Sequence, residues 1–315
     1  MIIPPPKLLL KKKEKFRSGY AAIVGKPNVG KSTLLNRLVM KKIAAISRKP
    51  QTTRNKITGV VHFPGGQIIL LDTPGIHKAS SQLNRLMVKA SLSTYHDVDI
   101  VLFVIDANQG FTDDDIFVLD TLKGTKPPKI LIINKIDLVS KPDLLGLMAE
   151  ANEKKSTFRE IIPISALRSN GLEDLGATTL NYLPEGPQYF PENMSTNCTE
   201  VFLVEEIVRE KIMQRTHMEI PYSVAVVVEG MQEGHGGVWV IDALIVVEKP
   251  SQKKILNGAK GAMLKNLGKP AREEIEKRFG CKVYLSLFVK VKNNWRQDKQ
   301  SLRELGYLNV SNKDG

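Results

Sequence analysis

Apolar and polar residues alternate along residues 19–183 in the manner of strands followed by helices. Several apolar runs are nearly uninterrupted, which is typical of strands covered on both faces of a sheet. These runs are GYAAIVG (19–25), GQIILLDTPG (66–75), VDIVLFVIDA (98–107), PKILIINKID (128–137) and EIIPISA (160–166). Between them, apolar residues recur at helical spacing in KSTLLNRLVM (31–40), SQLNRLMVKASLSTY (81–95) and DDDIFVLDTL (113–122). The alternation predicts an α/β domain with a mostly parallel sheet and helices on both faces.

The pattern changes after PEGPQYFPENMSTN (184–197), a segment that contains three prolines and several turn-forming residues. Beyond it, the order helix, strand, strand, helix, two glycines, helix, strand predicts a smaller α+β domain. The first helix and the three strands are expected at 200–215, 222–231, 238–249 and 281–292. We therefore divide the chain into a basic N-terminal extension (1–17), a first domain (18–183), a linker (184–199), a second domain (200–308) and a C-terminal tail (309–315).

The 315 residues carry a formal net charge of +13, and the basic residues are concentrated in two blocks. Residues 1–56 hold 15 lysines and arginines against one acidic residue, and residues 249–303 hold 15 against four. This segregation favours two surfaces that face polyanions, since solubility alone does not require it. Two cysteines are too few for a disulfide framework, which favours a reducing compartment. No apolar run approaches the ~20 residues of a membrane-spanning helix.

GKPNVGKS (25–32) matches the pattern G-x-x-x-x-G-K-[ST] and lies between a predicted strand and a predicted helix. Its glycines let backbone N–H groups turn toward phosphates, and the positive end of the following helix faces the same anion. Lys31 can reach the β- and γ-phosphates, and the hydroxyl of Ser32 can bind Mg²⁺. The motif predicts a site for a nucleoside triphosphate.

DTPG (72–75) ends the next predicted strand and supplies a second element of this site. Asp72 is placed to hold a metal-bound water near Mg²⁺, and the Gly75 amide can meet a γ-phosphate. The next residue is Ile76, where some GTPases have a glutamine that orients the attacking water. Because isoleucine cannot form a hydrogen bond with water, the sequence predicts slow intrinsic hydrolysis.

KKIAAISRKPQTTRNKITG (41–59) lies between these two motifs and is polar, without strong periodicity, as expected of a mobile segment. A threonine in such a segment can complete the Mg²⁺ shell when a γ-phosphate is present and leave it afterwards. We favour Thr53 for this part, with Thr52 as the alternative.

NKID (134–137) ends a further strand and favours GTP over ATP. Asp137 can accept two hydrogen bonds from the N1–H and N2 amine of guanine, a donor pair that adenine lacks, and Asn134 can contact the base edge. SAL (165–167) ends another strand, and its backbone can meet the guanine O6. All these elements follow in order at strand ends, where doubly wound sheets bind ligands.

In these motifs the chain resembles the Era family of bacterial-type GTPases. The residues that carry the resemblance are GKPNVGKSTLLNRL (25–38), RKPQTTRNKITG (48–59), LLDTPGIHK (70–78), NKIDL (134–138), PISAL (163–167), GAKGAMLKNLG (258–268) and FVKVKNNWRQDKQSLRELGY (288–307). The resemblance spans about residues 18–308. Asn257 departs from it, because the family usually has an apolar residue before the first glycine of GAKG.

The resemblance implies a Ras-like P-loop GTPase domain followed by a type II KH domain. The implied function is a GTP-hydrolysing switch whose KH domain binds the 3′ end of 16S rRNA during assembly and maturation of the 30S subunit. Mg²⁺ is the implied cofactor, and Asn28 is implied to help bind K⁺, which can offset charge in the transition state. The family also implies a monomer that binds GTP and GDP, located in the cytoplasm with peripheral contact with the inner membrane.

Motifs and resemblance together define the predicted nucleotide site. The GTP-binding residues are Gly25, Lys26, Pro27, Asn28, Val29, Gly30, Lys31, Ser32, Thr33, Asp72, Thr73, Pro74, Gly75, Asn134, Lys135, Asp137, Ser165, Ala166 and Leu167. The residues expected to act in hydrolysis are Asn28, Lys31, Thr53 and Gly75. The residues expected to bind Mg²⁺ are Ser32, Thr53 and Asp72.

GAKG (258–261) joins two predicted helices within the second basic block, which is the setting of a KH loop. Such a loop lets the nucleic-acid backbone approach closely, while a neighbouring groove reads about four nucleotides. Lysines near the loop can neutralise phosphates, and two apolar residues can line the groove or belong to the core. The predicted RNA-binding residues are Lys254, Ile255, Gly258, Ala259, Lys260, Gly261, Leu264 and Lys265.

Two other functions fit parts of this pattern. An RNA-binding protein with a purely structural nucleotide site is one, although the intact Lys31, Ser32, Asp72 and Asp137 argue against it. A membrane-associated signalling or cell-cycle GTPase that uses its basic blocks on anionic lipid is the other, and an amphipathic basic helix would favour it. Residues 261–279 also carry three glutamates, which suits a solvated helix face better.

Overall fold

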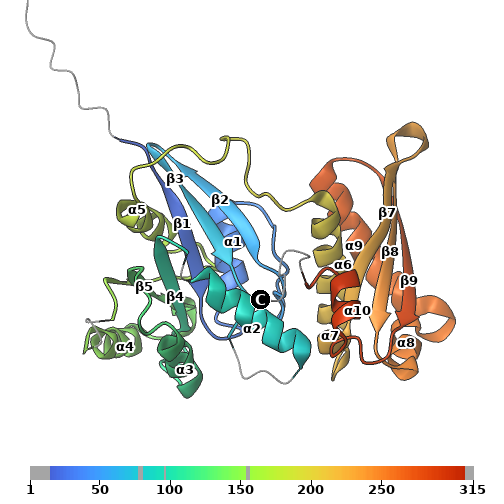
Figure 1. The fold of residues 1–315 in the computed structure, drawn as a ribbon, viewed down its shortest axis with the longest axis horizontal. Helices are drawn as coiled ribbons and strands as arrows, with labels where there is room; N and C mark the ends of the chain where they lie inside the picture. Colours follow the sequence, from blue (N-terminus) through green and yellow to red (C-terminus); the bar gives the residue numbers. More distant parts are fainter. Residues whose placement is uncertain (1–14, 77–80, 96, 154–156, 309–315) are drawn as a thin grey trace, which may run out of the picture.

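The computed structural model describes residues 15–76, 81–95, 97–153 and 157–308. Most of the predicted N-terminal extension and the whole predicted C-terminal tail lie outside these described residues, as does His77 of the DTPGIH run. Two separate sheets stand side by side, each with its own helices (Figure 1). The predicted fold class, an α/β domain followed by an α+β domain, is confirmed.

The first domain is built on a six-stranded sheet with the order β2-β3-β1-β4-β5-β6. All neighbouring strands are parallel except β2, which runs antiparallel to β3. Every residue of β4 is buried, as expected of a central strand covered on both faces. The strands are β1 (Arg17–Val24), β2 (Ile57–Phe63), β3 (Gly66–Asp72), β4 (Ile100–Asp106), β5 (Lys129–Asn134) and β6 (Glu160–Pro163).

Helices cover both faces of this sheet and divide its core in two. Side chains of α1 and α5 pack with Ala21 and Ile23 on one face, whereas side chains of α3 and α4 pack with Ala22 and Val24 on the other. Alternate residues of β1 thus pack into the cores on opposite faces of the sheet, because successive side chains of a strand point to opposite sides. The helices are α1 (Lys31–Val39), α2 (Gln82–Thr94), α3 (Asp113–Thr121), α4 (Lys141–Glu153) and α5 (Leu172–Tyr182).

Strand β2 corrects the prediction for residues 41–59. The end of that segment, expected to be mobile, is the first part of a hairpin with β3. The run ITGVVHF is rich in β-branched residues, and the following Pro64 and Gly65 form the turn, with Gly65 at φ 81°. This hairpin anchors the C-terminal end of the segment that carries Thr52 and Thr53.

Residues 184–199 contain no helix or strand and run along the first sheet before the second domain begins. The Gln67 side chain accepts hydrogen bonds from the backbone N–H groups of Tyr189 and Phe190, and Val60 N–H donates to the Ser195 carbonyl at 2.8 Å. The connecting segment is therefore bound to β2 and β3 of the first sheet.

The second domain has the element order that the sequence predicts. Its sheet has the order β7-β8-β9, with β7 antiparallel and β9 parallel to β8. Side chains of α6, α8 and α9 pack on one face of this sheet. The main elements are α6 (Glu200–Arg215), β7 (Ala225–Glu233), β8 (Trp239–Val247), α8 (Pro250–Asn257), α9 (Ala262–Phe279) and β9 (Val283–Val291). Two short helices, α7 (Ile220–Ser223) and α10 (Lys299–Glu304), complete the domain.

The two domains share an apolar contact. Leu83 and Met87 of α2 belong to the same buried cluster as Val246, Trp295 and Leu302 of the second domain. Figure 1 shows α2 directed toward α6 and α10. Across this contact, Leu83 N–H donates to the Arg296 carbonyl at 3.0 Å. Among the described helices, none combines the length and the apolar composition that crossing a bilayer requires.

Candidate nucleotide and RNA sites

The first motif, residues 25–32, forms the turn between β1 and α1. Gly30 precedes the first residue of α1 with φ 103°, a backbone conformation that favours glycine, and a Cβ atom there would lie 2.3 Å from Asn134 Nδ2. Because α1 starts at Lys31, its unpaired N–H groups face the cavity described below. A helix N-terminus with such a turn is suited to phosphate.

Lys31 extends across the turn and is 7% exposed. Its Nζ donates hydrogen bonds to the carbonyls of Gly25 and Lys26, both at 2.8 Å. Burial lowers the pKa of Lys31 to about 8, against the opposing effect of the Asp72 and Asp115 carboxylates. The ammonium group is thus held at the head of α1, beside the predicted phosphate position.

Three oxygen-bearing side chains meet at the start of α1. Ser32 Oγ lies 2.7 Å from Asp72 Oδ2 and 2.8 Å from Thr53 Oγ1, and Thr53 Oγ1 lies 3.3 Å from Asp72 Oδ2. Burial raises the pKa of Asp72 to about 6, although the Lys31 charge and the two hydroxyls lower it. Within the described residues, the buried Asp72 Oδ1 has no hydrogen-bond partner. These hard oxygen groups fit Mg²⁺.

Residues 41–59, called the switch segment below, contain two threonines whose hydroxyl groups have different partners. Thr53 is 7% exposed and joins this oxygen cluster, whereas the Thr52 hydroxyl donates to the Lys49 carbonyl at 2.8 Å. The structure therefore brings together Ser32, Thr53 and Asp72, the three residues predicted as metal ligands.

The DTPG turn is held in place by α2. Thr73 Oγ1 lies 3.2 Å from the hydroxyl of the buried Tyr95, and Ser91 Oγ donates to the Pro74 carbonyl at 2.9 Å. Thr73 and Pro74 therefore brace the turn, whereas Gly75 lines the cavity. Ile76 is 1% exposed and belongs to the core on the α3 and α4 face of the sheet.

The last two motifs meet at the other end of the cavity. Ser165 Oγ donates to Asp137 Oδ1 at 2.5 Å, and Lys135 Nζ pairs with Asp106 at 2.5 Å. Asn134 is 2% exposed; its Nδ2 donates to the Val29 carbonyl at 2.8 Å and its Oδ1 accepts from Ala166 N–H at 2.9 Å. The Nδ2 amine carries a second hydrogen, so these two bonds are compatible with the predicted contact of Asn134 with a base edge. Asn134 braces the first motif against the last.

A cavity of about 880 Å³ runs between these motifs. The predicted site residues that line it are Pro27, Asn28, Gly30, Lys31, Ser32, Thr33, Thr53, Gly75, Asn134, Lys135, Asp137, Ala166 and Leu167. The predicted residues that do not line it are Gly25, Lys26, Val29, Asp72, Thr73, Pro74 and Ser165. Most of the second group are buried behind the wall, where they support its shape.

Lys26 is the clearest case of such support. It is 6% exposed, and its Nζ lies 2.9 Å from Asp115 Oδ2 and 2.7 Å from Thr112 Oγ1, at the start of α3. Its charge therefore pairs with a buried carboxylate on the far side of the turn.

Several cavity residues had not been expected from the sequence. Leu138 lies beside Asp137 at the wall. Met213 and Gln214 come from the end of α6 in the second domain, and His217 follows that helix. Helix α6 carries no motif that points to a nucleotide, so its contribution follows only from how the domains pack.

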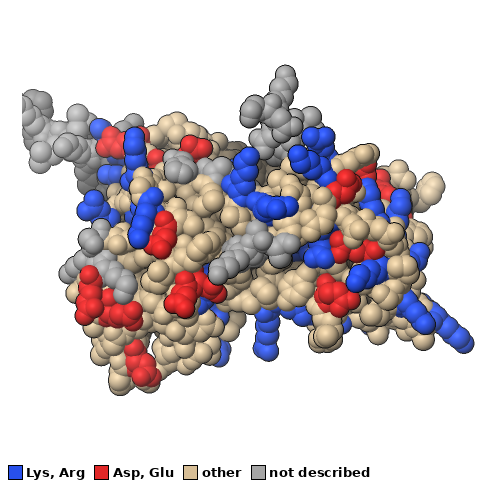
Figure 2. Space-filling model, turned by 60° about the horizontal axis from the view of Figure 1, so that its bottom comes forward, with Lys and Arg blue, Asp and Glu red and all other residues tan. Residues whose placement is uncertain are grey.

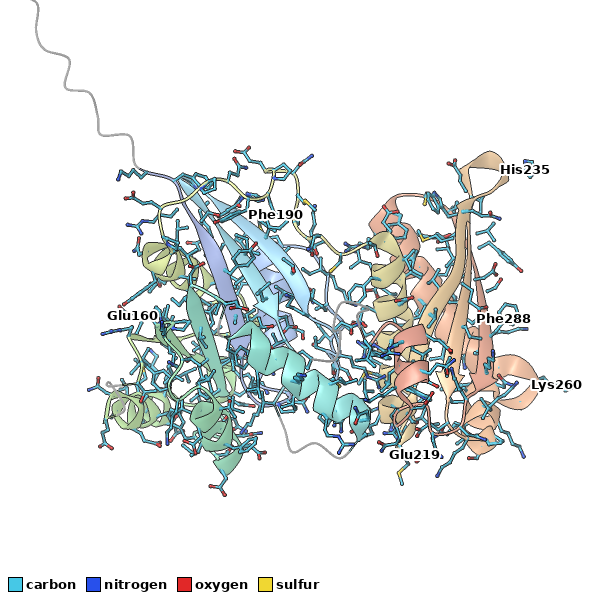
Figure 3. The ribbon with its side chains drawn as sticks, in the orientation of Figure 1. Glu160, Phe190, Glu219, His235, Lys260 and Phe288 are labelled. Atoms are coloured by element: carbon cyan, nitrogen blue, oxygen red, sulfur yellow. The ribbon has the colours of Figure 1, made fainter. Side chains whose placement is uncertain are left out.

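The GAKG segment forms the predicted loop between α8 and α9. Gly258 has φ 68°, and a Cβ atom there would lie 2.8 Å from Met263 N, so this position requires glycine. Gly261 has φ 78° with open space around it. Figure 3 shows Lys260 at the end of the second domain that is farthest from the first domain.

The predicted RNA residues differ in exposure. Lys254, Ala259, Lys260 and Lys265 are exposed, and Ile255 is 53% exposed, whereas Leu264 is half-buried against the core of the second domain. Figure 2 shows lysine and arginine side chains projecting at this end among a few acidic ones.

Two exposed aromatic residues on the edge strand β9 were missed. Phe288 is 58% exposed and Tyr284 is 63% exposed, and both project from one face of the strand, four residues apart. Helix α8 packs beside β9. Alternation within YLSLF is the only sequence signal for these residues, and it also suits an ordinary strand.

Comparison with known proteins agrees with both domains. Residues 20–135 match the family model described as 50S ribosome-binding GTPase, and residues 219–296 match that of the KH domain. The chain is 48% identical to GTPase Era of Geotalea daltonii, over 93% of this chain and 99% of the relative. It is 49% identical to GTPase Era of Syntrophus aciditrophicus, over 93% of this chain and 95% of the relative.

Two solved structures are similar over the same extent. A single-residue variant of Aquifex aeolicus Era bound to GDP·AlF4⁻ superposes with a TM-score of 0.89 at 42% identity, covering 93% of this chain and 99% of that one. Era in complex with MgGDPNP and nucleotides 1506–1542 of 16S ribosomal RNA superposes with a TM-score of 0.90, also at 42% identity and with the same coverage.

Proposed function

The chain belongs to the Era family of GTPases, and on that premise we propose that it binds GTP and GDP in the 880 Å³ cavity, hydrolyses GTP, and binds the 3′ end of 16S rRNA through its KH domain during assembly and maturation of the 30S subunit. The observation that carries the enzymatic part is the cluster of Ser32, Thr53 and Asp72 beside Lys31 at the head of α1.

The phosphates are bound at the end of the cavity next to the N-terminus of α1. The N-terminus of α1 and the Lys31 ammonium meet the phosphate charge, and Gly75 lets its amide approach the γ-phosphate. Ser32 and Thr53 would hold Mg²⁺ through their hydroxyl oxygens, and Asp72 would support the ion from the same cluster. The ion, when bound, offsets charge on the β- and γ-phosphate oxygens.

The guanine base is bound at the opposite end. The exposed Asp137 accepts the N1–H and N2 donors of guanine, and Ser165 holds this carboxylate in place. Leu138 and Leu167, 59% and 60% exposed, both line the cavity and offer apolar surface for a planar base. Asn134 joins the two ends of the site and can contact the base edge through the second hydrogen of its Nδ2.

Hydrolysis is slow without a partner. The buried Ile76 has no group that could orient the attacking water, so orientation depends on other atoms. Asn28 Nδ2 donates to the Arg48 carbonyl at 3.0 Å, and its amide oxygen is the group suited to K⁺. A cation bound there would offset negative charge in the transition state, in addition to the charge that Lys31 offsets.

RNA is bound at the far end of the KH domain. Gly258 and Gly261 let the RNA backbone approach the loop, and Lys260 and Lys265 neutralise phosphates. The exposed Phe288 gives a base an aromatic face to stack on.

The test is GTP turnover in K⁺ and in Na⁺, with and without an RNA that ends in the 16S 3′ sequence. We expect turnover to be faster in K⁺ than in Na⁺, with Asn28→Ala removing the difference, and RNA to change the rate. Absence of turnover in every condition would overturn the enzymatic proposal. Normal turnover with no binding of the RNA would overturn the RNA part alone.

The family's cytoplasmic location, its peripheral contact with the inner membrane and its monomeric state are included in this proposal. Sedimentation with anionic vesicles at physiological salt, with and without the RNA as competitor, tests the membrane contact. We expect weak binding that the RNA removes, and vesicle binding that RNA leaves unchanged would favour the signalling alternative.

A further inference from the structure

Thr53 and Arg54 are adjacent in sequence, and their side chains belong to different domains. Thr53 points into the oxygen cluster of the GTPase domain, and Arg54, 4% exposed, is buried in the KH domain. Its Nη1 donates to the Val224 carbonyl at 2.5 Å, and its Nη2 donates to the carbonyls of Pro221 and Tyr222 at 3.1 and 3.2 Å. The guanidinium therefore binds three backbone carbonyls at the end of α7.

Two aromatic rings from the C-terminal part of the chain complete this pocket. The rings of Trp295 and Tyr307 lie 5.8 Å apart and are nearly parallel, and the guanidinium carbon lies 6.0 and 5.9 Å from their centres. The Tyr307 hydroxyl accepts a further hydrogen bond from Nη1 at 3.3 Å. Trp295 is fully buried and donates from Nε1 to the Ser223 carbonyl at 3.0 Å. Cation–π contacts are strongest when desolvated in this way.

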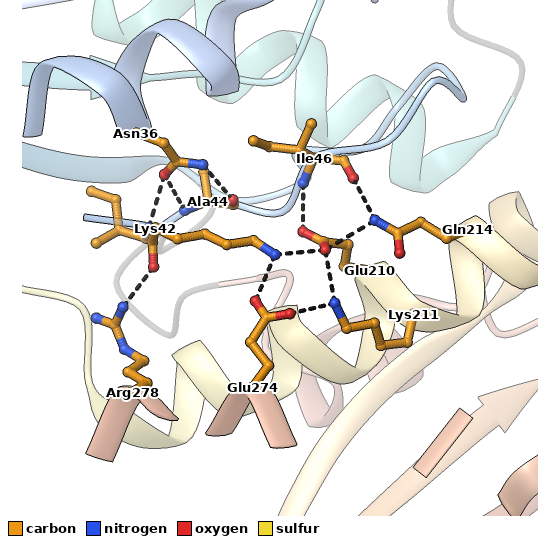
Figure 4. A network of polar contacts seen from close by, with 10 residues as sticks. Asn36, Lys42, Ala44, Ile46, Glu210, Lys211, Gln214, Glu274 and Arg278 are labelled. Atoms are coloured by element: carbon orange, nitrogen blue, oxygen red, sulfur yellow. Dashed lines mark hydrogen bonds and ion pairs between the residues drawn. The ribbon is translucent and has the colours of Figure 1, made fainter. Parts of the chain in front are cut away.

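The rest of the switch segment is bound to the same domain. Ile46 N–H donates to Glu210 at 2.8 Å, and Lys49 Nζ donates to the carbonyls of Met213 and Thr216 on and after α6. Figure 4 shows the first end of the segment, where Lys42 meets Glu210 of α6 and Glu274 of α9. The segment thus contacts the KH domain from Lys42 to Arg54, just before it enters β2.

The geometry couples the two sites. Neighbouring Cα atoms are about 3.8 Å apart, so with Arg54 in its pocket the backbone on one side of Thr53 is anchored, and a large displacement of Thr53 from Ser32 and Asp72 pulls on the Arg54 side chain. If Thr53 leaves the metal site after loss of the γ-phosphate, the buried Arg54 guanidinium is drawn away from its carbonyls. This costs free energy, because buried polar groups lose their hydrogen bonds. Conversely, a filled pocket favours the threonine at the metal site.

We infer that Arg54 is a positioning residue through which the docked KH domain holds Thr53 at the nucleotide site, so that preference for GTP over GDP depends on the Arg54 pocket even when no RNA is bound. The inference rests on the proposed nucleotide function. By linkage, the coupling is reciprocal: a GTP analogue stabilises the docked arrangement as much as docking stabilises its binding.

The test compares Arg54→Met with Lys56→Met in the full-length chain. Lys56 is an exposed cation two residues away, which makes it a matched control. Dissociation constants for GDP and for the non-hydrolysable analogue GDPNP are measured with Mg²⁺ and without RNA. In Arg54→Met, affinity for GDPNP should fall by about 5- to 150-fold, the usual range of coupling between sites. Affinity for GDP should change less than about 2-fold, and Lys56→Met should match the wild type for both nucleotides.

A spectroscopic readout covers the case in which Arg54→Met folds poorly. The chain has two tryptophans, so Trp239→Phe leaves Trp295, in the pocket itself, as the only one. Exchange of GDP for GDPNP should change Trp295 emission in this single-tryptophan protein, and adding Tyr307→Phe, which removes one hydroxyl, should reduce that change.

The outcomes separate the two proposals. If wild type binds neither nucleotide, the proposed function fails. If GDP binds normally but Arg54→Met keeps the wild-type ratio of affinities, or if Trp295 emission does not respond to the exchange, the inference about Arg54 is overturned and the nucleotide site stands.

Discussion

Lys42 Nζ lies 2.5 Å from Glu274 Oε1, which pairs a lysine of the GTPase domain with a carboxylate on α9, the helix that begins directly after the GAKG loop. The same lysine lies 2.6 Å from the buried Glu210 of α6, and Lys211 pairs with both glutamates. Arg278, near the end of α9, donates to the Lys42 carbonyl at 2.6 Å. The helix that presents the candidate RNA loop is thus bound by charge to the segment that leads to Thr53.

Glu274→Gln tests how much this charge contributes to stability. The substitution keeps the shape of the side chain but leaves Lys42 and Lys211 without a charged partner on α9. We expect the free energy of unfolding to fall by about 1 kcal/mol, since the pair is partly exposed and solvent screens it. Urea denaturation measures the change, and Glu273→Gln, on the exposed face of α9, is the matched control with no expected effect.

The contribution of the Lys42–Glu274 pair to stability should depend on pH. Burial alone would raise the pKa of Glu274, but hydrogen bonds from Lys211 and Lys42 outweigh it, so the pKa is lowered. A carboxyl group of this kind stabilises the fold above its unfolded-state pKa and loses that contribution as pH falls through the folded value. The stability difference between wild type and Glu274→Gln should shrink between about pH 7 and pH 3. A difference that stayed constant would contradict the ionic origin of the effect.

Asn134 should contribute to stability without any nucleotide. Asn134→Ala leaves the Val29 carbonyl and the Ala166 N–H without their partner inside the protein. We expect the free energy of unfolding of nucleotide-free protein to fall by about 2 kcal/mol, with Asn108→Ala, an exposed asparagine, as control. If stability fell only when GDP was present, the two bonds to Val29 and Ala166 would contribute nothing and Asn134 would act on the base alone.

Asp137 should determine the choice of base. Asp137→Asn replaces an acceptor by a donor where guanine offers two donors, so GDP affinity should fall by about 100-fold or more and xanthosine diphosphate should bind better than GDP. Competition binding with the two nucleotides measures this, with the exposed Asp143→Asn as control. Retained guanine preference would refute the part assigned to Asp137.

The nucleotide motifs could be recognised from the sequence because each one is a local structure. The turn of residues 25–32 depends on its own glycines and on the helix that follows, and parallel strands bring their ends to one edge whatever else the chain does. The same holds for GAKG, where Gly258 has φ 68° and no room for a side chain.

The features that could not be predicted from the sequence depend on contacts between residues far apart in the chain. Asn134 is satisfied by Val29 and Ala166, which are distant in sequence, and nothing in NKID indicates those partners. Similarly, Arg54 reads as one more basic residue of a polar segment, although it is buried against rings about 240 and 250 residues away along the chain. Hydrophobic periodicity carries no information on such contacts between domains.

Lys260 and Phe288 should contribute to RNA binding in different ways. Lys260→Ala removes an exposed charge at the loop, so it should weaken binding of a 16S 3′-terminal RNA and reduce the slope of log affinity against log salt by about 1. Phe288→Ala removes a stacking surface, so affinity should fall by about 1–3 kcal/mol with the slope unchanged. Titrations over a range of KCl concentrations measure both quantities. Lys277→Ala, an exposed lysine in the last turn of α9, is the control and should change neither. Equal slopes for Lys260→Ala and wild type would mean that the loop lysine does not meet phosphate, and unaltered affinity of Phe288→Ala would exclude stacking on Phe288.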